Sequence, residues 1–229
     1  MSLEYVKRNF EELSGEIAEL AEKYSDGGVT LVSVTKSGSD EEVLELVRSG
    51  AADIGENRPQ MLVSRGDMLA GLGFFPTLHE IGSLQRNKVK LVVGRAGLIH
   101  SLDSERLAEA ISREALSRGI KMPVLIEINS GREEAKGGIF PENAEAALIA
   151  FKKYEGLMIS GIMTMGPVTE TPEEIRPYFR ETKKIFDDLN SRYGFDFGGI
   201  LSMGMSDSYK IAIEEGSTLV RVGRRLFIK

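Results

Sequence analysis

The sequence predicts a single (β/α)₈ barrel preceded by one additional helix. Two observations carry this prediction. Short aliphatic, β-branched runs alternate with amphipathic helical stretches, and eight such runs can be counted, seven of them followed by a clear helix. Repeated βα units demand parallel strands joined by right-handed crossovers. Eight units in about 200 residues fit a closed barrel at the small end of its size range, and a doubly wound open sheet is the competing architecture.

The additional helix is expected within residues 1–26. Val6, Phe10, Leu13 and Ile17 recur there at helical spacing, and "SDGG" closes the segment. The segment is acidic and amphipathic, unlike a signal peptide with a basic start and an apolar middle.

The βα units follow in order. The strand candidates are "VTLVSVTK" (29–36), "ADIGEN" (52–57), "TLHEIG" (77–82), "LIHSLD" (98–103), "PVLIEINS" (123–130), "LMISGIMTM" (157–165), "ILSMGM" (200–205) and "LVRVG" (219–223). The helices between them are recognised by amphipathic spacing and by polar or Pro starts. They are expected at 39–50, from about 58, from about 85, at 104–118, 141–151, 172–192 and 206–217.

The composition bounds the class of protein. Of 229 residues, 41% are hydrophobic, and the net charge of −6 argues against non-specific nucleic-acid binding. With no cysteine and two histidines, neither disulfides nor a thiolate or His-rich metal site is expected. No run approaches the roughly 18 apolar residues that span a bilayer. We therefore expect one domain over residues 1–229 that is cytoplasmic and monomeric, with no metal, membrane or nucleic-acid partner.

The first strand ends on a lysine, Lys36, where a barrel places its active groups. Val32, Val34 and Lys36 share one face of that strand by the two-residue alternation. Both faces of a barrel strand are partly buried, so this alternation leaves two interpretations open. Lys36 is either an amine at the mouth of a pocket or a solvated surface lysine.

Two glycine turns near the end of the chain predict an anion site. "SMGMSDSYKIAIEEG" (202–216) places Gly204 in a turn and Ser206 and Asp207 at a helix start, where free N–H groups favour an anion. "RVGRR" supplies Gly223 after the eighth strand, and loops after strands seven and eight form the recurrent phosphate site of such barrels. The simpler alternative is an N-cap at Ser206 and a tight turn. Asp207 would oppose an anion unless it faces away.

A lysine opposite a phosphate site suggests a phosphorylated aldehyde or ketone held as a Schiff base. Pyridoxal phosphate (PLP) and the substrates of sugar-phosphate aldolases both meet this description. Arg221 lies two residues before Gly223 and is a permanent donor, suited to the nitrogen of a pyridine ring. Alternatively, Arg221 pairs with an interior carboxylate such as Glu127. An aldolase would use Glu127 and Asp103 as its acid/base pair.

Five segments together resemble the pyridoxal phosphate homeostasis proteins, the YggS/PROSC family. They are "SVTK" (33–36), "GENRPQ" (55–60), "HEIGSLQRNK" (79–88), "IEINSGREEAKGG" (126–138) and "SMGMSDSYKIAIEEGSTLVRVG" (202–223). The resemblance implies a barrel like the N-terminal domain of alanine racemase. It also implies PLP bound as a Schiff base to Lys36, Asn57 beside the cofactor ring, and Arg221 facing the pyridine nitrogen.

The resemblance assigns the phosphate to Ser202, Gly204, Ser206 and the backbone N–H of Gly223. Where the family usually has a hydroxyl residue after this last glycine, the sequence has Arg224, which either binds the phosphate through charge or turns outward.

The same resemblance bears on three other positions. Glu80 stands where an aromatic residue is usual, which puts the packing beside His79 in doubt, and His79 is expected to be structural. Lys136 falls in the lysine-glycine loop of the family, and a part in passing PLP on would follow from that position.

The same residues favour a carrier over an enzyme. A racemase needs a second acid/base on the far side of the cofactor, supplied in racemases of this fold by a tyrosine of an additional domain. The sequence ends with the barrel, and Tyr209 is the candidate nearest the mouth. We expect a protein of PLP homeostasis that delivers PLP to recipient enzymes. A PLP-dependent racemase and a Schiff-base aldolase remain the alternatives.

Overall fold

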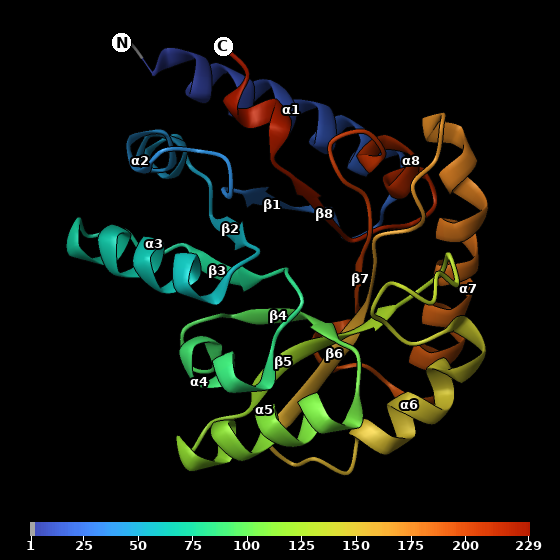
Figure 1. The fold of residues 1–229 in the computed structure, drawn as a ribbon. Coiled ribbons are helices and arrows are strands. Elements are labelled where there is room, and N and C mark those ends of the chain that lie inside the picture. The colour runs from blue at the N-terminus through green and yellow to red at the C-terminus, as the bar shows by residue number, and fades with distance from the viewer. Residues whose placement is uncertain (1–2) are drawn as a thin grey trace.

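Eight parallel strands close into a barrel in the computed structural model, which describes residues 3–229 (Figure 1). Each strand pairs with the next in the chain, and the last pairs with the first, so the barrel is confirmed and the open sheet is wrong. The strands are β1 (Thr30–Val34), β2 (Asp53–Glu56), β3 (Thr77–Glu80), β4 (Leu98–Leu102), β5 (Met122–Ile128), β6 (Leu157–Thr164), β7 (Ile200–Ser202) and β8 (Leu219–Val222).

Helices surround the barrel (Figure 1). The α-helices are α1 (Glu4–Tyr24), α2 (Asp40–Arg48), α3 (Pro59–Gly71), α4 (Val89–Val92), α5 (Glu105–Ser117), α6 (Ala144–Phe151), α7 (Arg176–Tyr193) and α8 (Tyr209–Glu214). Short 3₁₀ turns are η1 (Arg86–Lys88), η2 (Pro141–Asn143), η3 (Pro172–Ile175), η4 (Asp196–Gly198) and η5 (Arg224–Phe227). The helix expected from about residue 85 is short: η1 runs directly into α4, which is a single α-turn that stops before Gly94.

The amino-terminal helix α1 packs against the carboxyl-terminal segment. Val6, Leu13 and Ile17 are buried in one cluster with Val220 of β8 and Leu226 of η5. The two ends of the chain therefore lie on the same side of the barrel (Figure 1). Burial of these aliphatic side chains, about 1.5–3 kcal/mol each, holds the additional helix against the β1–β8 seam.

A capping box fixes the start of α2, directly after the turn that contains Lys36. The Ser39 hydroxyl accepts from the Glu42 N–H at 3.3 Å, and the Glu42 carboxylate accepts from the Ser39 N–H at 2.6 Å. Such caps contribute about 1 kcal/mol. The turn between β1 and α2 is thus held at its α2 end.

The barrel interior is partly apolar and partly polar. Val32, Leu98, Leu125, Met163 and Leu219 form an inner apolar cluster, whereas the larger cluster lies between the sheet and the outer helices. Within residues 3–229 no helix is long and apolar enough to cross a membrane.

Candidate functional site

Lys36 lies in the turn that follows β1, two residues beyond the last strand residue, Val34. Its side chain is exposed, and within residues 3–229 its ammonium makes no hydrogen bond or ion pair. Its neighbour Thr35 is buried and anchored: the Thr35 N–H donates to the Gly55 carbonyl at 3.0 Å, and its hydroxyl donates to the Glu56 carboxylate at 2.5 Å. A fixed backbone therefore presents a free amine at the carboxyl end of the barrel.

Asn57 follows β2 at the same end of the barrel and is exposed. The loop after β3 crosses directly over its backbone: a Cβ at Gly82 would lie 2.3 Å from the Asn57 carbonyl oxygen. Only a residue without a side chain allows this close approach. The "GEN" and "HEIG" segments of the sequence thus meet in space.

Arg221 is the cationic centre of the barrel interior. Its side chain is buried, and its guanidinium donates to the Ser202 hydroxyl at 2.5 Å and to the Thr164 carbonyl at 3.0 Å. Burial lowers the pKa of Arg221 to about 10, opposed by the negative charge of Glu127, so the group is still cationic at neutral pH. A guanidinium has five N–H groups, so these two bonds leave donors for a ligand.

Glu127 faces Arg221 without pairing to it directly. Burial, reinforced by repulsion from Asp103, raises the pKa of Glu127 to about 7, and the charge of Arg221 opposes the shift. The interpretation of Arg221 as an ion-pair partner of Glu127 is therefore only partly right, since the hydrogen bonds of Arg221 go to Ser202 and Thr164.

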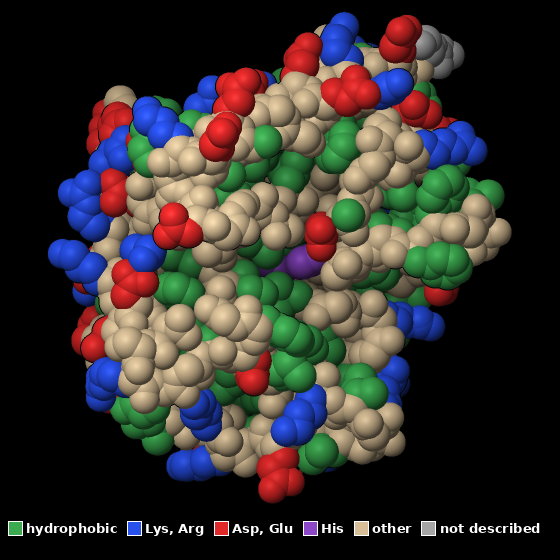
Figure 2. All heavy atoms as spheres, turned by 180° about the vertical axis from the view of Figure 1, so that it is seen from behind, with side chains coloured by type: hydrophobic (Ala, Val, Ile, Leu, Met, Phe, Trp, Pro, Cys, Tyr) green, Lys and Arg blue, Asp and Glu red, His purple; other side chains and the backbone are tan. Residues whose placement is uncertain are grey.

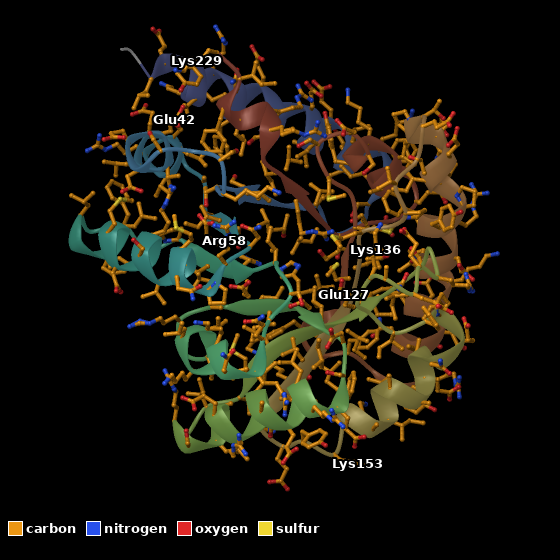
Figure 3. All side chains as sticks on the ribbon, viewed as in Figure 1. Glu42, Arg58, Glu127, Lys136, Lys153 and Lys229 are labelled. Atoms are coloured by element: carbon orange, nitrogen blue, oxygen red, sulfur yellow. The ribbon has the colours of Figure 1, made fainter. Side chains whose placement is uncertain are left out.

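The glycine-rich loop after β5 folds back over Glu127. The Ile139 N–H donates to the Glu127 carbonyl at 2.7 Å, and the Asn129 N–H donates to the Ile139 carbonyl at 2.9 Å. The ammonium of Lys136 in this loop pairs with Glu133 at 2.7 Å. Glu127 and Lys136 lie toward the centre of the barrel, whereas Lys153 and Lys229 lie at its periphery (Figure 3).

The two predicted glycine turns meet each other. The Gly223 N–H donates to the Ser206 hydroxyl at 3.4 Å, and the Gly204 carbonyl accepts from the Arg221 N–H at 3.1 Å. Gly204 has φ +95°, and a Cβ there would lie 2.5 Å from the Cβ of Ala212, so glycine is required on both counts. The sequence therefore identified a real junction of the loops after β7 and β8.

The predicted helix start at Ser206 and Asp207 is wrong. Residues 206–208 form a turn, and α8 begins at Tyr209 with no side-chain cap. The Ser206 hydroxyl bonds Gly223 instead of capping a helix, and Ser208 takes the local bond by accepting from the Met205 N–H at 3.1 Å. An anion at this place would therefore be held by the loop junction, not by the end of a long helix.

Three of the predicted phosphate residues form this junction, and the side chains of the other two bind other protein groups. Ser202 is fully buried, and its hydroxyl bonds Arg221 and His100. Arg224 is largely exposed and forms an ion pair with Asp207, which answers the concern that Asp207 would oppose an anion. A phosphate role for Ser202 or Arg224 stays a prediction, and each has a protein partner that a ligand would have to displace.

Sequence reasoning missed the polar groups that surround Arg221. Thr164 ends β6, and His100 lies in the middle of β4, next to the fully buried Ser101 and Ile99. A polar residue inside an otherwise apolar strand, as His100 is in "LIHSL" and Thr164 at the end of "LMISGIMT", is a signal that could have found them. Which of them meet depends on the closure of the barrel. The part of the chain that the structure describes holds no group of three or more His, Cys, Asp or Glu residues able to bind a metal ion.

Comparison with known proteins gives a consistent result. The family model of the alanine racemase N-terminal domain matches residues 10–228. The pyridoxal phosphate homeostasis protein of Aquifex aeolicus is 40% identical over 197 residues, 86% of this chain and 85% of that protein. The protein of the same name from Helicobacter pylori is 35% identical over 201 residues, 87% of each chain.

Solved structures agree. PipY of Synechococcus elongatus with PLP bound is 26% identical with a TM-score of 0.83, over 97% of this chain and all of that chain. An unknown protein from Bifidobacterium adolescentis is 33% identical with a TM-score of 0.89, over 98% of this chain and 95% of that chain. Alanine racemase from Corynebacterium glutamicum is 15% identical with a TM-score of 0.73 over 61% of its chain, a likeness of fold alone.

Proposed function

The chain belongs to the alanine racemase N-terminal domain family and, within it, to the pyridoxal phosphate homeostasis proteins; from this premise we propose that it holds PLP as a Schiff base on Lys36 and serves intracellular PLP homeostasis and transfer. The cofactor is PLP: the relatives carry its name, and the solved relative PipY has it bound. Bound PLP supplies an aldehyde that reacts reversibly with an amine, a phosphate, and a pyridine nitrogen.

The closure of the barrel between β1 and β8 is the observation that carries the proposal. The register pairs Val32 with Arg221 and Ser33 with Val222. A Cβ at Gly223 would lie 2.8 Å from the Val34 carbonyl oxygen, so the turn after β8 presses against the end of β1. Lys36, Arg221 and the Gly223 turn therefore belong to one wall of the barrel, although Lys36 and Arg221 lie near opposite ends of the sequence.

The residues at this wall fit the three groups of PLP. The free, exposed amine of Lys36 suits the aldehyde. The buried guanidinium of Arg221 is a donor only, so it suits an unprotonated ring nitrogen and weakens the ring as an electron sink. The backbone N–H of Gly223 is bound only at 3.4 Å to the Ser206 hydroxyl, so a phosphate oxygen can take its place.

Asn57, Ser202 and Arg224 are supported less directly. Asn57 directly follows the neighbouring strand β2 at the same end of the barrel, where it can flank a ring held by Lys36. We propose that Ser202 contributes through Arg221, and that Arg224 acts only after it leaves Asp207.

The surroundings of Tyr209 support a carrier over a racemase. Its hydroxyl bonds the Glu16 carboxylate of α1 and the Arg225 guanidinium, and burial together with the Glu16 bond raises the pKa of Tyr209 well above its ordinary value. A tyrosine held in this way is not a ready acid/base for an α-proton. Fast turnover of an amino acid is therefore not expected, and an amine or a recipient enzyme can reach an exposed lysine.

The test is a visible absorption spectrum of the purified protein with added PLP, followed by borohydride reduction and peptide mass mapping. We expect an imine band and a pyridoxyl adduct on Lys36, both lost in Lys36→Ala and kept in the matched control Lys153→Ala at the periphery. Loaded protein should also restore activity to the apo form of a PLP-dependent aminotransferase. An adduct that survives in Lys36→Ala would reject the assignment, and rapid racemisation of alanine would replace the carrier by an enzyme.

A further inference from the structure

Four hydrogen bonds link Arg221 to Asp53 through the inside of the barrel. The Arg221 guanidinium is 2.5 Å from the Ser202 hydroxyl, which is 3.1 Å from Nδ1 of His100. Nε2 of His100 is 3.0 Å from Nδ1 of His79, and Nε2 of His79 is 2.9 Å from the Asp53 carboxylate. The chain uses side chains of β8, β7, β4, β3 and β2, and it includes both histidines of the protein.

Donor and acceptor chemistry gives this chain one direction. A guanidinium only donates, so the Ser202 hydroxyl accepts from Arg221 and its own proton points to Nδ1 of His100. Nδ1 of His100 then carries no proton, and Nε2–H of His100 donates to Nδ1 of His79. Nε2–H of His79 donates to the Asp53 carboxylate. Every group is satisfied only when both imidazoles are neutral and protonated at Nε2.

The electrostatics agree with this assignment. A full cation stands at one end and a carboxylate at the other, so the four bonds align and strengthen one another in a site of low dielectric. Burial holds the pKa of His100 well below its ordinary value, and the positive charge of Arg221 lowers it further, which keeps that ring neutral. Glu127 is the carboxylate that faces Arg221 from β5.

The two ends of this hydrogen-bonded chain, Asp53 and Arg221, lie toward opposite ends of the barrel. Asp53 is the first residue of β2 and is 24% exposed in its side chain, whereas Arg221 reaches the carbonyl of Thr164, the last residue of β6. Figure 2 shows a histidine side chain at the bottom of a hollow near the centre of the face turned away from the viewer in Figure 1, beside an acidic side chain. The hydrogen-bonded chain therefore starts near solvent and ends at the proposed cofactor site.

We propose that Asp53, His79, His100 and Ser202 are positioning residues that hold the Arg221 guanidinium in place for the pyridine nitrogen, so that Asp53, at the far end of the barrel, tunes the cofactor. This inference deepens the proposed function and rests on it for the identity of the ligand. Arg221 is a long, flexible side chain, and a ring nitrogen needs its donor at one place. The Ser202 hydroxyl and the Thr164 carbonyl each accept a hydrogen bond from Arg221, and the hydrogen-bonded chain orients the Ser202 hydroxyl.

The chain can be tested without PLP by nuclear magnetic resonance of the imidazole nitrogens. With two histidines in the protein, four ring nitrogens make the whole spectrum. At neutral pH we expect both rings in the neutral Nε2–H form, with Nδ1 unprotonated. In Asp53→Ala the ring of His79 loses its acceptor and should change its tautomer balance, and the signals of His100 should move with it. In Asp53→Asn the amide oxygen still accepts, so the tautomers should stay.

The link to the cofactor is tested with PLP as the probe. We expect Asp53→Ala to weaken PLP binding about fivefold and to shift the pH profile of the imine absorption band, with Asp53→Asn between it and the wild type. Asp67→Ala in α3 is the matched control, because its carboxylate is largely exposed and lies outside the chain. Circular dichroism of each variant checks that the fold is kept. Asp53 is the first residue of β2 and is partly exposed, so its substitution should leave the fold intact.

Each outcome is decisive. A histidine that is protonated at Nδ1 or doubly protonated at neutral pH would overturn the directional chain. Correct tautomers combined with unchanged affinity and imine spectrum in Asp53→Ala would overturn the positioning role. A wild-type protein that binds no PLP would refute the proposed function and with it the positioning role, and the tautomer result would still decide the chain itself.

Discussion

The buried polar groups on the two faces of strands β2 and β3 differ in their hydrogen bonding. On the inner face, Asp53 and His79 bond each other at 2.9 Å and continue into the chain that ends at Arg221. On the outer face, Glu56 and Glu80 are paired in register and almost fully buried. Among the described residues each of these two carboxyl groups has one oxygen, Oε2, without a hydrogen-bond partner.

The difference shows that the effect of burying a polar group depends more on its hydrogen-bond partners than on how deeply it is buried. Burial, with repulsion from Glu56 adding to it and a bond from the Gly82 N–H opposing it, raises the pKa of Glu80 to about 8. Burial also raises the pKa of Glu56, against the bond from Thr35. The hydrogen bonds of the inner face therefore fix the positions of side chains, whereas the buried carboxyl groups of the outer face make the stability of the protein depend on pH.

Breaking the inner chain at Ser202 should have the largest effect. Ser202→Ala leaves a guanidinium N–H of Arg221 and Nδ1 of His100 buried without partners, so we expect the free energy of unfolding to fall by about 3 kcal/mol. Urea denaturation at pH 7 measures this. Ser160→Ala is the matched control, because that buried hydroxyl of β6 has one hydrogen bond within residues 3–229, to the Met158 carbonyl at 3.2 Å. Equal losses in the two variants would mean that the chain adds nothing beyond one ordinary hydroxyl bond.

Removing the outer carboxylate should stabilise the protein in alkaline solution. The pKa of Glu80 is raised from 4.5 to about 8 on folding, so its contribution is fully present below pH 4.5 and is lost as the pH rises to 8. The slope from this group reaches about 1.4 kcal/mol per pH unit inside that window. Glu80→Gln cannot ionise and should be more stable than the wild type by about 2 kcal/mol at pH 9.

Thermal unfolding of wild type and Glu80→Gln between pH 5 and 9 checks this prediction. Glu155→Gln on the surface is the control for loss of one negative charge. Parallel pH profiles of wild type and Glu80→Gln would show that Glu80 is ionised in the folded protein at little cost, and the contrast between the two faces would fail.

Glu127 provides a smaller effect of the same sign inside the barrel. Its pKa is raised from 4.5 to about 7, so the stability that its proton adds is present below pH 4.5 and is lost as the pH rises through 7. Glu127→Gln should remove this part of the pH dependence while leaving the dependence from Glu80 between pH 7 and 8. Denaturation midpoints at half-unit steps of pH separate the two windows, and one shared window would contradict the assignment.

Arg224 should have the smallest effect. Its ion pair with Asp207 joins two side chains that are each 70% exposed, and such pairs contribute about 0.5 kcal/mol or less. We expect Arg224→Ala to change stability by no more than that and to weaken PLP binding by less than about threefold. Isothermal titration with PLP measures the latter. Complete loss of binding with an intact fold would show that Arg224 leaves Asp207 to anchor the phosphate.

Much of the fold could be predicted from the sequence because its signals are local. Apolar β-branched runs, Gly and Pro stops and amphipathic spacing gave eight strands in their correct order. The errors lie where a local signal is weak. The segment after Gln85 has residues typical of a helix, but its α-helix, α4, is a single turn. Ser206 resembles an N-cap, but helix α8 starts three residues later, at Tyr209.

The sequence by itself determined the strand order, the position of Lys36 at the end of the first strand, and the glycines of the turns at Gly204 and Gly223, because each depends on residues close in the chain. Only the tertiary structure decided which side chains meet. The contact of Gly223 with Val34 and the path from Asp53 to Arg221 require strands that are far apart in sequence to be brought together, and the surface pairing of Arg224 with Asp207 requires the loops after β7 and β8 to meet. That arrangement follows from the closure of the barrel and from the burial of its polar interior.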